Sequence, residues 1–375
     1  MQLLDMFRRM VNESLSIGLA HNVCSVKRLS LLSYKQLKNY DCPSYYRLCA
    51  ISRAAGILAS RKKSLKRGYA SRTPYAVKPQ LVSCYGFKIG KDSLRIPLGG
   101  GRYHGLPLNK HTVSVISQPG VKVRSFTLTL TALSLTIARE VEEIECEKTI
   151  GVDRNLCNLT VGNAERVVQH NLSETVRIAK TTVRIVSSFK RDDVRIRHRV
   201  ASKYGRRRKA RTDYLLHSAT KRIVGEAVSR REAIVLEDIR RIRHLYQRGN
   251  GQGRKHRGRM NGWSFARAQS QMEYKAQWNG LPIIRLCRRE TRGSSIVCPR
   301  CGERLQSDRY LKRKLWCGKC RRVMDRDVVA VVNLSKRGRL RFDRSQPTAQ
   351  AQGGAVEAVM GNPTPTVISG VDPRS

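Results

Sequence analysis

The fold of this chain is decided by the stretch Thr149-Ile-Gly-Val-Asp-Arg-Asn-Leu-Cys-Asn-Leu-Thr-Val-Gly162. Its first half predicts a buried strand that ends in Asp153, and its second half predicts another strand over Leu156–Val161. Asn155 is typical of the turn that would join them. The stretch therefore predicts a hairpin with an acidic residue at the end of its first strand.

Strands and helices alternate after this hairpin. Arg166–Gln169 predicts a third strand, a helical pattern extends over residues 173–230, and Ala233–Glu237 predicts a fourth, buried strand. Ser264–Trp278 then has apolar residues at helical spacing, and Leu281–Leu286 predicts a fifth strand. This alternation indicates an α/β domain.

Three acidic residues stand where these elements end or begin. Asp153 and Glu237 each follow the apolar residues of a strand, and Asp327 opens a helix of apolar residues. Each acid alone has an ordinary explanation as a turn or cap residue, and Asp327 in particular suits the start of its helix. The order of strand with Asp, hairpin, helix, strand with Glu and helix with Asp is nevertheless that of an RNase H-like nuclease.

Three carboxylates that meet at the rim of one sheet suit divalent cations. Mg²⁺ and Mn²⁺ take hard oxygen ligands, and two such ions about 3.5–4 Å apart can cleave a phosphodiester. One ion would activate the attacking water and the other would stabilise the leaving 3′-oxygen. The three acids therefore predict a metal-dependent nuclease.

Two Cys-x-x-Cys pairs form the sharpest local pattern. Cys298-Pro-Arg-Cys301 and Cys317-Gly-Lys-Cys320 are separated by fifteen residues, and Gly302 and Gly318 suit the tight turns of such a motif. Four thiolates in tetrahedral geometry predict a closed, structural Zn²⁺ site with no position open for water. The alternative is a redox-active pair, but redox motifs occur singly. Zinc is therefore not expected to be the catalyst.

Charge is the dominant property of the whole chain. Among 375 residues, 74 Lys+Arg stand against 28 Asp+Glu, so the formal net charge is +46. Such repulsion destabilises a compact fold unless a polyanion relieves it, and nucleic acid is the simplest polyanion. A membrane surface is the alternative, but no run of about 18 apolar residues occurs. Charge alone would also suit a structural RNA-binding protein.

Cysteine usage indicates a reducing, cytoplasmic location. The total of 11 cysteines is odd, and no signal peptide is evident. The seven cysteines outside the paired motifs are scattered in apolar or mixed segments, as small buried residues commonly are: Cys24, Cys42, Cys49, Cys84, Cys146, Cys157 and Cys287.

The residues before Glu147 contain no catalytic constellation, so we expect them to bind rather than to react. Apolar spacing predicts three helices, over Leu3–Leu19, Leu29–Tyr40 and Pro43–Leu65. Four short segments interrupted by glycines then predict a small antiparallel β unit, either a sandwich or a barrel. These segments are Leu81–Ile89, Leu94–Leu98, Thr112–Ser117 and Lys122–Leu130.

Basic clusters are the candidate phosphate contacts. Residues 184–211 contain twelve Lys or Arg and two acids, and a helix this polar needs a partner such as a nucleic-acid backbone. A basic helix end can equally be a solvated face. Residues 248–262 are rich in Gly and Arg and predict a loop. The candidate contacts are Arg61, Lys62, Lys63, Lys66, Arg67, Arg206, Arg207 and Arg208.

Four motifs of the second half resemble those of one family. They are Gly151-Val-Asp-Arg-Asn-Leu156, Ile234-Val-Leu-Glu-Asp-Ile239, the paired cysteine motifs, and Asp325-Arg-Asp-Val-Val-Ala-Val-Val-Asn-Leu334. Together they look like the three RuvC motifs and the inserted zinc ribbon of TnpB, the transposon-encoded OrfB family of RNA-guided DNA endonucleases ancestral to type V CRISPR effectors. The likeness covers about residues 149–334, and the Asp-Arg-Asn form of the first motif resembles archaeal members.

The resemblance implies a domain plan. It combines an α/β RuvC domain of RNase H-like fold, carrying a zinc ribbon, with an N-terminal α+β half. The expected segments are a helical recognition lobe (1–80), a wedge-like β-barrel (81–147), the RuvC core (148–297), the zinc ribbon (298–320), the helix of the third motif (321–340) and a disordered tail (341–375).

The resemblance also implies an activity and its partners. Asp153, Glu237 and Asp327 would hold the catalytic Mg²⁺ or Mn²⁺, and the four paired cysteines would hold zinc. A guide RNA transcribed from the transposon end would direct the cutting of both strands of a double-stranded DNA target. Such a protein would be prokaryotic and associated with the nucleoid.

Two departures from the family pattern stand out. Members begin with a strand, whereas this chain enters a predicted helix almost at once, so the barrel is expected to lack its first strand or the start to be assigned too late. The run Val328–Val332 also replaces a smaller, more polar sequence. Two other functions stay open: a non-cleaving, RNA-guided DNA-binding repressor, and a transposase that acts directly on DNA ends.

Overall fold

The computed structural model describes residues 2–69, 71–189, 192–239, 242–307, 310, 313–345, 356–360 and 366–367. Its contacts divide the chain into unit 1, residues 1–140 with 359–375, and unit 2, residues 141–358. The predicted boundary between the helical lobe (1–80) and the β-barrel (81–147) therefore lies inside unit 1. Among the described residues, no helix is both long enough and apolar enough to cross a membrane.

Unit 1 begins with the three predicted helices, which the structure confirms. They are α1 (Gln2–Ala20), α2 (Val26–Leu37) and α3 (Ser44–Lys66). Helix α1 packs against α3 and strand β1, and Phe7, Met10 and Tyr46 are fully buried between these elements. The apolar stripe read from the sequence is therefore the face that the helices bury.

Two sheets complete unit 1, and the pairs β1–β5, β5–β6, β6–β16, β2–β3 and β3–β4 in them are antiparallel. The larger has the order β1-β5-β6-β15 with β16 also paired to β6, and the smaller has the order β2-β3-β4. No pairing among the described residues closes either sheet into the expected barrel. The strands are β1 (Gln80–Ser83), β2 (Lys88–Ile89), β3 (Ser93–Gly99), β4 (Arg102–Pro107), β5 (Val121–Thr129), β6 (Ala132–Val141), β15 (Val356–Met360) and β16 (Thr366–Val367).

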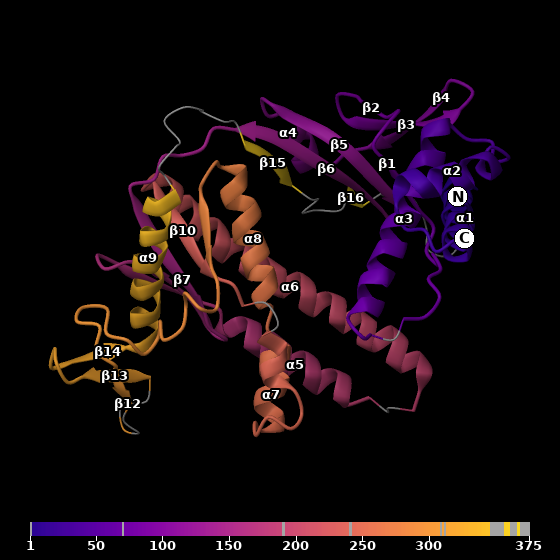
Figure 1. Ribbon diagram of the computed structural model, residues 1–375. Helices are drawn as coiled ribbons and strands as arrows, with labels where there is room; N and C mark the ends of the chain where they lie inside the picture. Colours follow the sequence, from indigo (N-terminus) through magenta and orange to yellow (C-terminus); the bar gives the residue numbers. More distant parts are fainter. Residues whose placement is uncertain are drawn as a thin grey trace. The chain divides into compact units, whose positions relative to one another are not determined.

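Unit 2 is built on a five-stranded sheet of order β11-β10-β7-β8-β9 (Figure 1). Strands β7, β8 and β9 pair antiparallel, whereas β10 and β11 continue the sheet parallel to β7. This confirms the predicted hairpin and the strands that follow it. The bounds are β7 (Lys148–Arg154), β8 (Asn158–Gly162), β9 (Val167–Asn171), β10 (Glu232–Glu237) and β11 (Ile283–Leu286).

Helices cover both faces of this sheet. Ile150 and Val152 join a core with residues of α6 and α8, whereas Gly151, on the alternate face of β7, lies under α9. A Cβ on Gly151 would lie 2.2 Å from the carbonyl oxygen of Val331, so only glycine allows α9 this close. The helices are α5 (Ser173–Ser187), α6 (Val194–Ser229), α7 (Arg254–Asn261), α8 (Phe265–Trp278) and α9 (Arg326–Ser345), with a 3₁₀ turn at Ile242–Tyr246.

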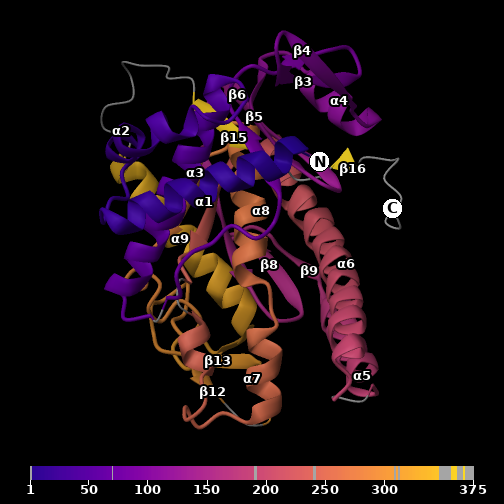
Figure 2. The ribbon, with the colours of Figure 1, turned by 90° about the vertical axis from the view of Figure 1, so that its right-hand side faces the viewer.

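Three sequence predictions were wrong. Thr112–Ser117 belongs to helix α4 (Lys110–Ile116) rather than a strand, because the Asn109 side chain accepts the Thr112 N–H at 2.7 Å and caps the helix. The helical region 173–230 is a hairpin of two helices, α5 and α6 (Figure 1), of which Figure 2 shows α6 along its length. Helix α5 ends at Ser187, and Asp193 caps α6. The predicted loop 248–262 contains α7.

The paired cysteines lie in a three-stranded sheet of β12 (Gln306–Ser307), β13 (Lys314–Cys317) and β14 (Arg322–Asp325). Of the predicted disordered tail, residues 341–375, the structure describes the end of α9 and strands β15 and β16. The remainder of that prediction lies outside the described residues.

Candidate active site and metal centre

The three predicted acids line one cavity of about 430 Å³ in unit 2. Asp153 lies two residues after Gly151 in strand β7. Glu237 lies two residues after Val235 in strand β10. Gly151 and Val235 are paired in register and both meet α9, so Asp153 and Glu237 also face that helix. Asp327 is in the first turn of α9. The alternation of two neighbouring strands and the start of one helix therefore bring the three carboxylates together.

Burial and mutual repulsion disfavour the charged form of Asp153 in this cavity. Burial raises the pKa of Asp153 to about 6, and the negative charges of Asp327 and Glu237 act in the same direction. The Asn155 amide opposes the shift because it donates to Asp153 Oδ2 at 2.9 Å. A divalent cation would relieve the repulsion between the carboxylates, and carboxylate oxygens are its preferred ligands. The donor atoms are therefore of the kind that Mg²⁺ and Mn²⁺ bind, although the three carboxylates do not all lie within 4.8 Å of one another.

Asp327 does not cap its helix, which removes the ordinary explanation for this residue. Asp325 takes that place: its Oδ1 accepts the backbone N–H of Asp327 at 2.8 Å and that of Val328 at 3.4 Å. The Asp327 residue is only 4 % exposed and lines the cavity. Its carboxylate is thus free of a backbone role.

Two arginines beside the carboxylates were missed by the sequence analysis. Arg154, on the opposite face of β7 from Asp153, is buried and donates to Gln269 Oε1 at 2.6 Å and to the backbone carbonyl of Glu237. Burial lowers the pKa of Arg154 to about 10. Arg313, largely exposed, forms an ion pair with Asp327. Nothing in the local sequence distinguishes these two among 74 Lys and Arg residues.

The four paired cysteines form a second, separate constellation. The Sγ atoms of Cys298 and Cys320 are 3.9 Å apart, those of Cys301 and Cys317 are 3.5 Å apart, and all four lie within 4.8 Å of one another. A tetrahedral zinc with Zn–S bonds of about 2.3 Å places its sulfurs about 3.8 Å apart. The cluster therefore has the size and the donor atoms of a structural zinc site. Among the described residues, the four cysteines are the only group of three or more ligating side chains whose donor atoms lie close enough together to share one ion.

The tight turns of the two cysteine motifs differ from the expectation in one respect. Gly302, after the first pair, has a φ of 77°, as predicted for a left-handed turn. In the second pair the left-handed residue is Arg321, with a φ of 49°, and not Gly318. Each turn thus places its left-handed residue directly after the second cysteine.

The ribbon packs on the helix that carries Asp327. Val329 of α9 is fully buried in a small core with Cys298 and Cys317. Further along α9, the Asn333 amide donates to the carbonyls of Ser294 and Val297, both at 2.7 Å. The cysteine cluster therefore anchors the start of the helix that positions the third carboxylate.

The predicted phosphate contacts fall in different parts of the molecule. Five lie at the end of α3 in unit 1 (Arg61, Lys62, Lys63, Lys66 and Arg67), and three lie in the middle of α6 in unit 2 (Arg206, Arg207 and Arg208). Arg208 lines a second cavity of unit 2, whereas Arg206 and Arg207 are exposed outside it. Their contact with nucleic acid stays a prediction.

Comparison with known proteins agrees with this architecture. Residues 265–334, which span α8, the cysteine cluster and the start of α9, match the Cas12f1-like TNB domain family. A TnpB-like protein of Methanocaldococcus jannaschii, MJ0751, is 37% identical over 135 residues, which cover 36% of this chain. The match spans less than half of that relative, namely 46% of its length.

A solved structure shares the fold over most of the chain. It is the protein of a Cas12f1–sgRNA–target DNA complex, with a TM-score of 0.63 and 14% identity, and the match covers 89% of this chain and 81% of that one. At this identity the likeness concerns the mixed α/β fold alone. Over these segments the chain is therefore similar to a Cas12f1-like TNB domain and to a TnpB-like protein.

Proposed function

We propose that this protein is an RNA-guided DNA endonuclease that depends on Mg²⁺ or Mn²⁺. The observation that carries the proposal is the convergence of Asp153, Glu237 and Asp327 in one cavity, where burial and repulsion raise the pKa of Asp153 to about 6. The sheet around them, three antiparallel strands continued by two parallel ones, is consistent with the RuvC type of RNase H-like nuclease.

Each residue of the site has a definite part in this proposal. The three carboxylates would hold the divalent ions, and the chemistry that such ions supply is the activation of water for attack on phosphorus. Arg154 holds the end of β10 through the Glu237 carbonyl and so fixes where the Glu237 side chain begins. The four cysteines would hold a structural zinc that takes no part in the reaction.

The proposed partners are a guide RNA from the transposon end and a double-stranded DNA target. The net charge of +46 provides the electrostatic attraction for both polyanions. The protein of similar fold was solved in a complex with an sgRNA and target DNA, so an architecture of this kind accommodates both. A transposon-end origin of the RNA follows from the family resemblance.

The test is plasmid cleavage by the full chain with its co-purified RNA and Mg²⁺. Asp153→Asn, Glu237→Gln and Asp327→Asn should each slow cutting by at least about a hundredfold, because each loses several kcal/mol of metal-mediated stabilisation. Glu165→Gln is the matched control, since Glu165 is exposed and pairs only with Lys148 among the described side chains. Undiminished cutting by all three site variants would refute the proposal.

One observation favours a second candidate, a non-cleaving RNA-guided DNA-binding protein. Arg313 pairs with Asp327 and thereby occupies one of the three carboxylates. A target that is already unpaired at the cutting position separates the candidates, because it removes any need to open the duplex. If the wild-type protein binds this target without cleaving it and the Arg313→Gln variant cleaves it, the ion pair blocks the site.

A further inference from the structure

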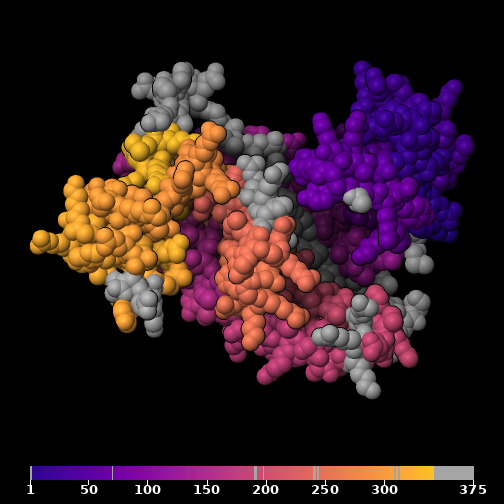
Figure 3. Space-filling view, turned by 60° about the horizontal axis from the view of Figure 1, so that its bottom comes forward, coloured from indigo at the N-terminus to yellow at the C-terminus, as the bar shows by residue number. Residues whose placement is uncertain are grey.

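A second cavity in unit 2, of about 1100 Å³, takes no part in the chemistry described above. Helices α5, α6 and α7 and the start of α8 surround it. In the space-filling view, α7 (red-orange) stands beside the α5–α6 hairpin (pink) (Figure 3). We call it the helical pocket.

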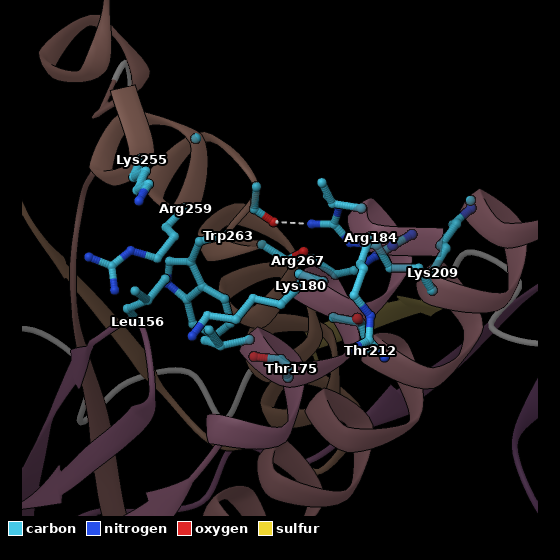
Figure 4. A pocket seen from close by; sticks show the side chains of 18 of the residues that line it. Leu156, Thr175, Lys180, Arg184, Lys209, Thr212, Lys255, Arg259, Trp263 and Arg267 are labelled. Carbon is cyan, nitrogen blue, oxygen red and sulfur yellow. Dashed lines mark hydrogen bonds between the residues drawn. The ribbon is translucent and has the colours of Figure 1, made fainter. Parts of the chain in front are cut away.

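The walls of the helical pocket are strongly basic. Seven Lys or Arg and no Asp or Glu are among the described residues that line it. Two of these cations have partners: Arg267 pairs with Asp213 at 2.7 Å, and Arg208 donates to the Gly262 carbonyl at 3.2 Å. Figure 4 shows Lys255 and Arg259 on one side of the pocket and Arg184 and Lys209 on the other. Cations on both sides suit a ligand that carries phosphates at intervals rather than one anionic group.

The floor between these cations is apolar and holds one unsatisfied donor. Leu156, Val176 and Val183 line it together with Trp263. Trp263 is 5 % exposed and its indole Nε1 has no hydrogen-bond partner. An indole N–H can only donate, and leaving it unpaired inside a protein costs free energy. The ring is held by an edge-to-face contact with Phe265, with centroids 5.3 Å apart.

Two glycines keep space open in the walls. Gly205 in the middle of α6 and Gly258 in α7 both line the helical pocket, and a Cβ on either would meet no atom within 4 Å. Glycine is unfavourable inside a helix, and no close packing demands it at these positions. Larger side chains at Gly205 and Gly258 would occupy the space that a ligand needs.

We propose that the helical pocket binds an unpaired segment of single-stranded nucleic acid, with a base against Trp263 and the flanking phosphates on the basic walls. A duplex cannot place a base on this floor, because its bases are stacked and paired inside the helix. Resting on the proposed nuclease function, the pocket guides a strand to the carboxylates, since Leu156 lines both cavities.

Binding is measured by fluorescence anisotropy with the full chain, washed free of nucleic acid at high salt and kept without divalent metal. The probes are an eight-residue oligothymidylate, the oligouridylate of the same length, and an abasic deoxyribose-phosphate strand. The base-bearing strand should bind about tenfold tighter than the abasic one, the equivalent of one stacked base. Trp263→Leu should abolish this preference. Comparison of the DNA and RNA probes identifies which strand the pocket takes.

Two pairs of variants test the site without changing the packing of Trp263. Gly205→Leu should weaken binding of the oligothymidylate, whereas Gly225→Leu, in the same helix α6 and also facing open space, should not. Arg184→Glu with Lys209→Glu should weaken it more than Arg288→Glu with Arg289→Glu, which changes the net charge equally at exposed residues outside the pocket.

The proposal for the helical pocket would be overturned if the two variants of either pair weakened binding equally. It would also be overturned if the abasic strand bound as tightly as the base-bearing strand. Because these measurements contain no divalent metal, they are independent of cleavage. If cleavage is normal but the expected differences in binding are absent, only the proposal for the helical pocket is refuted. Lost binding differences cannot be confused with a failed nuclease, which is judged by the carboxylate variants.

Discussion

Arg154 is a charged side chain that is 7 % exposed and satisfied by two partners on different elements. We predict that Arg154→Lys lowers the free energy of unfolding by roughly 1–3 kcal/mol, because one amine cannot reach both Gln269 and the Glu237 carbonyl. It should also slow cleavage, since the end of β10 loses its tie to β7. Urea denaturation and the plasmid assay measure the two effects.

Arg166→Lys is the matched control for Arg154. Arg166 pairs with Glu226 and Glu232, and Glu232 begins β10 at the end away from the cavity. This control should cost stability but leave the cleavage rate unchanged. Equal loss of cleavage in both variants would mean that Arg154 supports the fold and does not position the site.

Lys275 provides a pH-dependent test of packing. Burial lowers the pKa of Lys275 from 10.5 to about 8, and the nearby Lys221 charge acts in the same direction. Between pH 8 and 10.5 the unfolded chain therefore binds more protons than the folded chain, so this residue makes stability rise with pH. The contribution is present above pH 10.5 and is lost as the pH falls to 8.

Lys275→Met isolates this contribution at alkaline pH, because the His217 pKa, which the Lys275 charge lowers, lies below that range. The wild-type chain should gain more stability than Lys275→Met between pH 7.5 and 9.5, as measured by urea midpoints. Equal gains would show that Lys275 keeps its ordinary pKa in the folded protein. The Lys275 amine also donates to the His217 carbonyl and to Thr220 Oγ1, both at 2.7 Å, so the variant should be less stable at high pH.

At the scale of elements, the ribbon and α9 act as one support for Asp327. Cys301→Ser should remove zinc and cost about 3–5 kcal/mol, as is typical for the loss of a metal site. Because Val329 of α9 shares its core with the cysteines, cleavage should fall even when Mg²⁺ is supplied in excess. Zinc content, thermal unfolding and plasmid cutting are measured together.

Cys287→Ser is the control for the ribbon, since Cys287 is exposed and outside the cluster. It should change none of the three quantities. A zinc-free Cys301→Ser protein that cuts at the normal rate would show that α9 keeps its place without the metal.

At the scale of the whole molecule, self-repulsion from the net charge of +46 governs both stability and binding. Raising salt from 50 to 500 mM should raise the melting temperature of the nucleic-acid-free chain, because exposed charges are screened. The same change should weaken nucleic-acid binding, with a slope of log K against log salt steeper than about −3, as expected for five or more phosphate contacts. A slope near zero would mean that few of the Lys and Arg residues touch phosphate.

The local pattern of apolar residues predicted most helices and strands. It was wrong where a capping residue starts a helix or where the chain turns back between two helices. Asp193 begins a new helix, α6, after α5 has ended at Ser187, and Asn109 turns a β-branched segment into α4. In both cases one polar side chain that binds backbone N–H groups overrides the periodicity of its neighbours. Cap residues are individually too common for a sequence to reveal which of them act.

The chemistry that this protein can attempt is readable from residue order alone: three acids at the ends of apolar runs, four thiols at ribbon spacing and a large excess of positive charge. Residue type and short-range spacing suffice for these, because strand alternation and cysteine-motif geometry are local. Only the tertiary structure decided that Asp325 rather than Asp327 caps α9, that Arg154 ties β7 to β10, and that α5, α6 and α7 enclose a basic pocket over Trp263. Each of these depends on which distant elements pack together, and long-range packing is not encoded in the spacing of neighbouring residues.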